Sequence, residues 1–560
     1  MFSSLPANAE KLLSWKWPEI EPYYQDLKQR ELSPDNVDRW MAEWSRIYSL
    51  VDEVYNRLYV ASTVDTADQE AKRLFDSYLD EVQPRFKAAE QSLKEKLLAS
   101  GLCPKGFELQ LKKIRVEAEI FRRENLPLLA EEQKLRSKYS ALTGSQTVQW
   151  QGRETTVAQL KPVYQEQDRA LREQAWRLAS ERQLGDREAL NGLWREYFEL
   201  RQAIAKNAGF SNYRDYRWKH LLRFDYSPDD CLAFGEAIER EVVPAAEMIY
   251  SRRREKLGVD KLRPWDLSVD PDNRPPLKPF RDMEELVSKT SQAFRRLDPE
   301  LAGQFGLMVQ EGLLDLENRK NKRPGGYCTT LAAAKRPFIF ANAVGVHGDV
   351  QTLLHESGHA FHAFASAGLP YVQQAEAPME FCEVASMAME LLAGRHLGAF
   401  YGQEDANRAF RDHLEGLILF WPYMAVVDAF QHWAYENPGQ ATDPAACDRT
   451  WSETYRRFTR GVDYAGLEDV LETGWQRKLH IFIHPFYYIE YGLAQLGSVQ
   501  TWGNSLKDPA GGLAAYKKAL ALGGTRPLPE LFAAAGARFA LDAGTLRSVT
   551  DLILGHIGRQ

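Results

Sequence analysis

His355-Glu356-Ser357-Gly358-His359 is the most informative stretch of this 560-residue chain. Positions i and i+4 of an α-helix lie one above the other on the same face. In a helix, His355 and His359 can therefore bind one zinc ion, and Glu356 can point at a water molecule on that ion. The alternative interpretation is a helix whose two histidines are buried and hydrogen-bonded in the core.

The residues on either side of this motif predict a mostly buried helix of about five turns. Asp349 suits the N-cap position, so the helix is expected to begin near Val350. Gly368 and Pro370 are expected to end it. A helical setting is what the zinc interpretation requires, because a loop would not hold the two histidines on one face.

A hydrolytic zinc site needs three protein ligands and one open position. The next predicted helix, with Pro378 at its N1 position, contains Glu380, Glu383 and Glu390. Glu380 falls in the first turn, where a carboxylate favourably meets the helix dipole. Glu383 and Glu390 share one face among apolar residues, where a carboxylate is costly without a metal or a partner. One could bind zinc while the other orients a histidine, and spacing alone does not choose between them.

Two runs of sequence, His355–His362 and Glu383–Glu390, form the pattern His-Glu-x-Gly-His-Ala-x-His followed by Glu-x-x-Ser-x-x-x-Glu. This pattern resembles the thimet oligopeptidase and oligoendopeptidase F family of zinc metallopeptidases, and the oligoendopeptidase F branch in particular. The likeness extends over roughly residues 140 to 555 and includes four more segments: Leu262–Leu267, Gly325–Cys328, Pro337–Asn342 and Pro485–Tyr491.

The resemblance implies a zinc-dependent endopeptidase that binds one zinc ion per chain and hydrolyses short, unfolded oligopeptides. It assigns the third zinc ligand to Glu383, beside His355 and His359, and makes Glu356 the general base on the zinc-bound water. It also implies a mainly α, zincin-like fold: a large helical body with a small β-sheet beside the active site and a deep substrate channel.

A cluster of hydroxyl and imidazole groups near residue 488 is a candidate for stabilising an oxyanion. Tyr488 and Tyr491 are three residues apart and can share a helical face. The alternative is a core aromatic patch. By resemblance, Tyr491 matches the family's transition-state tyrosine, and His484 falls where related sequences often carry a second tyrosine. His480 is a further candidate donor that the sequence does not separate from His484.

The apolar run Phe338–Ala341 predicts a β-strand. In zincin-like sites an edge strand beside the metal pairs with the extended backbone of the substrate, and such pairing tolerates many side chains. An ordinary strand of a small sheet would have the same sequence, and Gly325-Gly326 would then be a simple turn.

Two domains are expected from the length and pattern of the chain. Residues 1–190 would form an N-terminal helical region with a small hairpin at Val148–Val157, and residues 191–560 the catalytic domain. Within the first, apolar residues repeat every three or four positions over Trp40–Leu58 and again from Leu74 to Phe86. They predict two long helices packed as an antiparallel pair, the second kinked at Pro84.

The composition excludes several classes of partner. Charged residues make up 27% of the chain and the formal net charge is -7, so there is no basic surface for nucleic acid. No apolar run approaches the roughly 20 residues of a membrane span, and the first residues do not resemble a signal peptide. The five cysteines are scattered, which predicts a reducing, cytoplasmic location.

Two other classes of protein compete with the peptidase hypothesis. A di-iron or di-manganese helical bundle needs a second Glu-x-x-His pair. Only His359 among the 11 histidines has a glutamate three residues before it, so this class is disfavoured. The second alternative is a catalytically inactive, helical peptide-binding or scaffold protein with a relic metal site, which the intact zinc motif argues against.

Overall fold

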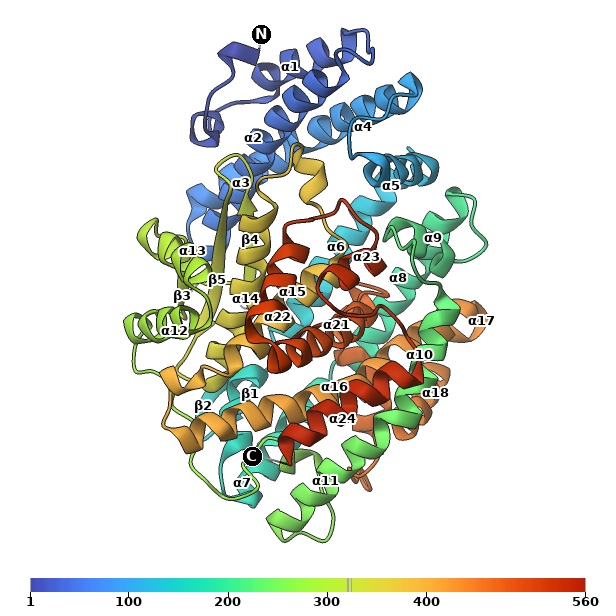
Figure 1. The fold of residues 1–560 in the computed structure, drawn as a ribbon. Helices are drawn as coiled ribbons and strands as arrows, with labels where there is room; N and C mark the ends of the chain where they lie inside the picture. The colour runs from blue at the N-terminus through green and yellow to red at the C-terminus, as the bar shows by residue number, and fades with distance from the viewer. Residues whose placement is uncertain (1, 320–321, 324, 559–560) are drawn as a thin grey trace. The chain divides into compact units, whose positions relative to one another are not determined.

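The computed structural model describes residues 2–319, 322–323 and 325–558 (Figure 1). Chain segments far apart in the sequence combine into two compact units. The first unit comprises Met1–Glu119, Leu277–Phe410 and Ala494–Phe539, and the second comprises Ile120–Pro276, Arg411–Leu493 and Ala540–Gln560. The expected division between residues 190 and 191 separates the chain at a single point, whereas each unit here is built from three segments. That division stays a prediction.

The first unit contains most of the helices at the N-terminal end and a three-stranded sheet. Its elements are α1 (Trp17–Gln29), α2 (Val37–Val64), α3 (Gln69–Glu81), α4 (Gln83–Ser100), α5 (Glu108–Ile120), α12 (Met283–Leu297), α13 (Pro299–Gln310), β3 (Leu314–Glu317), β4 (Tyr327–Leu331), β5 (Arg336–Ala343), α14 (His347–Ser366), α15 (Met379–Gly394), α22 (Pro509–Leu520) and α23 (Leu528–Ala534).

The second unit contains a two-stranded hairpin among helices. Its elements are α6 (Asn125–Gly144), β1 (Thr147–Trp150), β2 (Arg153–Thr156), α7 (Arg169–Leu184), α8 (Arg187–Asn207), α9 (Tyr213–His220), α10 (Pro228–Glu241), α11 (Val243–Leu257), α17 (Pro438–Ala441), α18 (Pro444–Phe458), α19 (Glu468–Glu472), α20 (Leu479–Phe482) and α24 (Ala543–Ile557). Two helices, α16 (Gln403–Glu436) and α21 (Tyr488–Lys507), are divided between the units, and the last residue of α5, Ile120, belongs to the second unit. Helices thus dominate both units, as the sequence predicts, and the predicted hairpin is confirmed by antiparallel pairing of β1 with β2.

The N-terminal helices confirm one of the two predicted long helices and correct the other. Trp40 and Trp44 of α2 are fully buried, as their spacing predicts. The second predicted helix is instead two helices, because Pro84 stands at the start of α4 and α3 ends at Glu81. A proline lacks the N–H that would continue the hydrogen-bonded ladder, so it begins a helix here rather than kinking one.

A buried carboxylate joins three of these helices. Glu90 of α4 accepts hydrogen bonds from the hydroxyl of Tyr24 in α1 (2.8 Å) and from the indole Nε1 of Trp44 in α2 (2.9 Å). Burial raises the pKa of Glu90 to about 7, although these two donors act to lower it. The core of the N-terminal helices therefore contains an acid that titrates near neutral pH.

The sheet of the first unit has the strand order β3-β5-β4. The run Phe338–Ala341 lies in β5, so the predicted strand is confirmed, but its expected role as an edge strand is wrong. β5 is paired on both sides, in parallel with β3 and antiparallel to β4. A strand buried on both faces reads as a continuous apolar run, which is the pattern that this segment has. The edge strand is β4.

Asn56 of α2 covers part of the free edge of β4. Its amide Nδ2 donates to the carbonyl oxygen of Thr330 (3.2 Å), and its Oδ1 accepts from the hydroxyl of Thr329 (3.0 Å). Alternate residues of a strand direct their backbone groups to the same edge, so the backbone N–H and C=O of Cys328 point the same way as those of Thr330. The edge is thus blocked at Thr330.

Helices α14 and α15 cross at very short distance. A Cβ atom at Gly358 would lie 2.6 Å from both the carbonyl oxygen of Ala385 and the Cα of Ser386, so only glycine fits there. The C-terminal segment of the unit covers α15 from another side: the Tyr516 hydroxyl donates to Ala385 O (2.7 Å), and Gly497 packs against Val384.

The start of each of these two helices differs slightly from the prediction. Asp349 is not the N-cap of α14, which begins at His347 after Val346. Its carboxylate instead reaches back from the first turn to the N–H groups of Val344, Gly345 and Val346. Pro378 is the N-cap of α15 rather than its first residue. In both cases the side chain recognised in the sequence acts at the helix end, displaced from the expected position by one to three residues.

Among the described residues, no helix combines the length and the apolar character needed to cross a membrane.

Candidate metal and catalytic site

α14 and α15 bring three of the predicted residues together in the first unit. The Nε2 atom of His355 lies 3.4 Å from Oε2 of Glu383, and the Nε2 atom of His359 lies 3.7 Å from the same oxygen. One ligand atom from each of the three residues lies within 4.8 Å of the others, an arrangement that could hold a metal ion. The close crossing at Gly358 is what allows a residue of α15 to reach both histidines of α14.

Glu390 lies behind the histidines rather than among the three. Its Oε1 atom is 2.7 Å from Nδ1 of His355, which leaves Nε2 of that ring directed toward Glu383. This is the usual relation of an outer carboxylate to a metal-binding histidine, whose ring orientation and tautomer it fixes. The geometry therefore separates Glu383 from Glu390, which the spacing did not.

Ser386 has a role that sequence reasoning did not assign. Its hydroxyl donates to Oε2 of Glu383 (3.0 Å) and so restrains the carboxylate that faces both histidines. The signal was present in the sequence, since Ser386 stands one helical turn after Glu383, where a side-chain hydrogen bond is possible.

The charges in this site shift the pKa values of its members strongly. Burial acts to raise the pKa of Glu383, but the hydrogen bond with His355 and the neighbouring His359 lower it to about 2. Burial acts to lower the pKa of His355, yet Glu383 and Glu390 raise it well above its ordinary value. His359, for which burial dominates, has its pKa lowered to about 4. A cationic ligand would find an ionised carboxylate and an unprotonated imidazole here.

The environment of the Glu356 carboxylate differs from that of the Glu383 carboxylate. It is 7% exposed, and burial together with the negative charges of Glu383 and Glu390 raises its pKa to about 7, against the opposing effect of His355. An acid with a pKa near the working pH can both accept and return a proton. The two glutamates on crossing helices thus have pKa values shifted in opposite directions, upward for Glu356 and downward for Glu383. Such a pair is found in sites where one carboxylate stays ionised and the other transfers protons.

The loop before β4 approaches the carboxylate of Glu356 closely. A Cβ atom at Gly326 would lie 3.5 Å from Oε1 of Glu356 and 3.4 Å from the carbonyl oxygen of Phe340. Gly326 also lines a cavity of about 230 Å³ between β5 and α14, together with Asn342 and Thr352. The backbone of the Gly325-Gly326 turn and open space therefore adjoin the Glu356 carboxylate.

The surroundings of Cys328 disfavour the reactive thiolate form of its side chain. Burial, and secondarily the Glu356 carboxylate, raise the pKa of the Cys328 thiol well above its ordinary value. The reactive form of cysteine is the thiolate, so a thiol held protonated beside a carboxylate is inert.

The aromatic cluster lies in the second unit. Tyr488 and Tyr491 are both in the first turn of α21 with ring centroids 5.7 Å apart, so they share a helical face as expected. The ring of His480 lies 4.8 Å from Tyr488 and 5.9 Å from Tyr491, whereas the nearest rings to His484 are those of Tyr487 (6.1 Å) and His480 (6.2 Å). These contacts favour His480 over His484 as the partner of the two tyrosines.

Both histidines of this cluster are neutral near pH 7. Burial is the main cause that lowers the pKa of His480 to about 3 and that of His484 to about 4. A neutral imidazole still offers one N–H donor. The participation of Tyr488, Tyr491 and His484 in catalysis stays a prediction.

The turn that leads into α21 is held by buried hydrogen bonds. Phe486 has a backbone φ of 63°, which is unfavourable for a bulky residue, and its N–H donates to Oε1 of Gln431 (2.7 Å). Arg223 donates both to the carbonyl oxygen of Phe486 (2.5 Å) and to Glu490 (2.7 Å). The positions of the tyrosines at the start of α21 are therefore fixed by the surrounding core.

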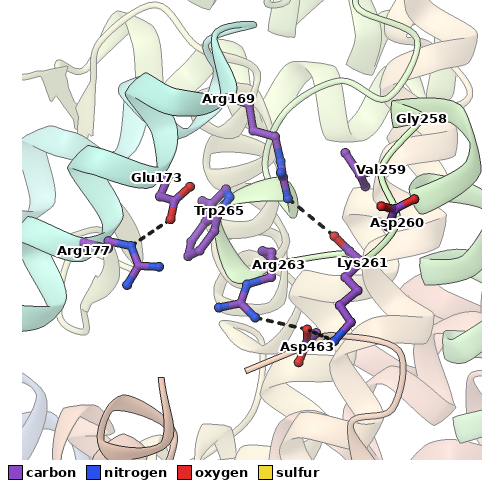
Figure 2. A pocket seen from close by; sticks show the side chains of 10 residues that line it. All are labelled: Arg169, Glu173, Arg177, Gly258, Val259, Asp260, Lys261, Arg263, Trp265 and Asp463. Atoms are coloured by element: carbon purple, nitrogen blue, oxygen red, sulfur yellow. Dashed lines mark hydrogen bonds and ion pairs between the residues drawn. The ribbon is translucent and has the colours of Figure 1, made fainter. Parts of the chain in front are cut away.

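A second cavity, of about 500 Å³, is lined in part by Arg263 and Trp265 of the Leu262–Leu267 segment (Figure 2). The guanidinium groups of Arg177 and Arg263 lie 5.1 and 5.0 Å from the ring centroid of Trp265. Each cation in its lining is ion-paired: Arg169 with Asp266, Arg177 with Glu173, and Lys261 and Arg263 with Asp463. These ion pairs join the segment to α7 and to the chain near Asp463 within the second unit.

Comparisons with known proteins show the family of this chain. The family model described as Peptidase family M3 matches residues 163–550, and that of the Peptidase M3 N-terminal domain matches residues 14–113. The solved structure of PZ peptidase A with an inhibitor superimposes with a TM-score of 0.90 at 29% identity, covering 100% of this chain and 99% of that chain.

Two curated relatives match over shorter spans. An oligoendopeptidase F homolog from Mycoplasma pneumoniae is 23% identical over 396 residues, which are 66% of this chain and 62% of that protein. An oligoendopeptidase F homolog from Lactococcus lactis subsp. lactis is 27% identical over 156 residues, or 28% of this chain and 25% of that protein. The matched region is thus less than two thirds of the length of either relative.

Proposed function

The chain belongs to peptidase family M3, and from this membership we propose that it is a zinc-dependent endopeptidase acting on short, unfolded oligopeptides. The observation that carries the proposal is the convergence of His355, His359 and Glu383 beside Glu356 on two crossing helices. The names of the similar proteins, PZ peptidase A and oligoendopeptidase F, support peptides as the substrate class.

The donor set fits one zinc ion. Two imidazoles and a carboxylate are a usual set for catalytic zinc, and they leave a position open. Both histidine Nε2 atoms are within 3.7 Å of Oε2 of Glu383, close to the separation of ligand atoms around one ion. When bound, zinc would polarise the scissile carbonyl group and make an attacking water more acidic.

The chain's own residues supply proton transfer and positioning. Glu356 would accept a proton from the attacking water and return it to the leaving amine, which its pKa near 7 suits. Glu390 would hold the ring of His355, and Ser386 the carboxylate of Glu383, so that neither ligand turns away.

Stabilisation of the oxyanion is assigned to the aromatic cluster. We propose that Tyr491 donates a hydrogen bond to the oxyanion, with Tyr488 and a neutral imidazole nearby as supporting donors. The shared face of the two tyrosines and the contacts of His480 with both rings support this proposal. His484, which the sequence does not separate from His480, is the weaker candidate because the ring of His480 contacts both tyrosines.

Peptide recognition is assigned to the free edge of β4. An extended peptide that adds to this edge would be held through its backbone, so many sequences would be accepted. Cys328 offers backbone groups on that edge next to Gly326, whose position is beside Glu356. The five cysteines are all free thiols, which supports a reducing cytoplasmic location for this activity.

The decisive test is Glu356→Gln, which keeps the size of the side chain and removes the base. With a mixed library of short peptides, the zinc-loaded wild type should give products and the variant should give none, while both retain zinc. Glu404→Gln, at an exposed glutamate in the first turn of α16, is the control for the same chemical change and should cleave normally.

Full activity in Glu356→Gln would contradict the mechanism. A wild type that binds zinc and peptides but yields no products would favour the competing hypothesis, a catalytically inactive peptide-binding or scaffold protein.

A further inference from the structure

We propose that the second unit contains a separate, buried metal site formed by Cys231, Asp428 and His432, and that it takes a thiophilic divalent cation of the zinc type. Asp428 and His432 are four residues apart on α16 and share one face, and Cys231 lies on α10. One ligand atom from each of the three residues lies within 4.8 Å of the others.

The spacing of these donors matches that of the candidate catalytic site. Nε2 of His432 lies 3.3 Å from Oδ2 of Asp428, compared with 3.4 Å between His355 and Glu383. Zinc binds nitrogen and oxygen at about 2.0–2.2 Å and sulfur at about 2.3 Å, so ligand atoms on one tetrahedral ion are about 3.3–3.7 Å apart. Closing the cluster around an ion requires side-chain movements on the order of 1 Å.

Burial makes this cluster costly in the absence of an ion. Cys231, Asp428 and His432 are exposed by 1%, 3% and 1%. Within the described part of the chain, Oδ1 of Asp428 and both ring nitrogens of His432 have no hydrogen-bond partner. Buried polar atoms are normally hydrogen-bonded, and a carboxylate away from water is unfavourable unless a cation balances it. A divalent ion would satisfy these atoms, since a thiolate and a carboxylate together carry two negative charges.

The surroundings would enclose the ion in the core of the second unit, away from solvent. The rings of Trp218 and Phe486 lie 5.8 and 5.2 Å from that of His432 and wall the cluster with apolar surface. Arg223, whose guanidinium lies over Trp218, is already bound to Glu490. An ion in this place would join α10 to α16 in the core of the second unit.

The donor types define the kind of ion. A thiolate and an imidazole favour Zn²⁺ and its spectroscopic substitutes Co²⁺ and Cd²⁺, whereas Mg²⁺ and Ca²⁺ prefer sites made of oxygen atoms alone. The candidate catalytic ligands include no sulfur. A sulfur-to-metal absorption band therefore distinguishes the two sites in one protein.

The experiment measures metal content and the absorption spectrum of the full-length chain. We expect two zinc ions per chain in the wild type, and a thiolate-to-Co²⁺ charge-transfer band after cobalt substitution. The double variant His355→Ala/His359→Ala should lose one ion and keep the band. Cys231→Ser should lose the other ion and the band.

Cys447→Ser is the matched control, because Cys447 is also a fully buried cysteine of the second unit. It should keep both ions and the band. If Cys231→Ser does not fold, His432→Gln replaces it, and loss of one ion is again expected. A single zinc ion per chain with no thiolate band in the wild type would overturn the proposal, as would a band that survives Cys231→Ser. Peptidase activity is not a readout of this test, so its outcome is independent of the proposed function.

Discussion

At the scale of single residues, Gly358 shows how a residue without a functional group can bring the side chains of a candidate metal site together. A methyl group there would collide with the backbone of α15 at Ala385 and Ser386, and backbone cannot move aside as a flexible side chain can. We predict that Gly358→Ala separates the two helices, lowers the free energy of unfolding by about 1–3 kcal/mol and weakens zinc binding.

Denaturant titration and zinc content measure these two effects. Gly348→Ala is the control, since a Cβ at Gly348, also in α14, meets no atom within 4 Å. Unchanged zinc affinity in Gly358→Ala would mean that the helix crossing does not set the geometry of the ligands.

Tyr491 is the residue whose hydroxyl we assign to the oxyanion. Tyr491→Phe removes that hydroxyl and keeps the ring, so kcat should fall by about 10²–10³ while zinc content and thermal unfolding stay as in the wild type. Steady-state kinetics on a single peptide substrate gives the answer. Tyr250→Phe, a tyrosine of α11 in the same unit, should have ordinary kinetics. If Tyr491→Phe is equally active, the residue belongs to the aromatic core alone.

At the scale of secondary-structure elements, the contact of α2 with the free edge of β4 would limit the length of a peptide bound at that edge. Asn56 binds the carbonyl oxygen of Thr330, so an added strand can pair at Cys328 but must stop there. We predict that Asn56→Ala accepts peptides longer by about one or two residues on one side of the cleaved bond, since neighbouring backbone sites on an edge recur every second residue.

Mass spectrometry of the products from peptides extended stepwise at each end measures this limit. Asn36→Ala, at the N-cap of the same helix, should leave the limit unchanged. The prediction is contradicted if Asn56→Ala and the wild type have the same length profile at both ends.

The buried acid that joins α1, α2 and α4 should make the stability of the protein depend on pH. The pKa of Glu90 is about 7 in the folded chain and near 4.5 when the chain is unfolded, so the folded state keeps a proton that the unfolded state releases. The free energy of unfolding therefore falls as the pH rises from about 4.5 to 7 and stays low above that. Glu90→Gln should raise it at pH 8 by about 1–3 kcal/mol and should have little effect at pH 4.5.

Denaturant unfolding of the wild type and Glu90→Gln at these two pH values measures the difference. Asp52, whose pKa burial raises to about 6, will retain part of the pH dependence in the variant. Glu95→Gln, at an exposed position of α4, controls for the change in charge. Equal slopes against pH for the wild type and Glu90→Gln would refute the assignment.

At the scale of the whole molecule, the features that could be predicted from the sequence are those that depend on residues close together in the chain. The pair His355 and His359, the helical N-terminal region and the strand at Phe338–Ala341 follow from periodicity and spacing. The choice of Glu383 over Glu390 came from family resemblance, because both stand on the same face of α15 and only the approach of α14 distinguishes them.

Three features required contacts between distant segments and could not be predicted from spacing. The position of β5 at the centre of the sheet depends on β3 and β4 together. The role of Asn56 depends on α2 lying against a strand more than 270 residues later in the chain. The cluster of Cys231, Asp428 and His432 depends on α10 meeting α16. None of these partners has a sequence signature of its own, since asparagine, aspartate and cysteine occur in many surroundings.

The assembly of the first unit from three separate segments has a consequence for the chain during its synthesis. The carbonyl oxygen of Ala385, two residues beyond Glu383, accepts a hydrogen bond from the hydroxyl of Tyr516, which is 131 residues later. At a translation rate of about 5–20 residues per second, roughly 7–26 s pass before that partner emerges from the ribosome. During this interval the face of α15 that the C-terminal segment covers lacks that cover, although α14 already packs on another face, so a nascent-chain chaperone has its best opportunity to bind there.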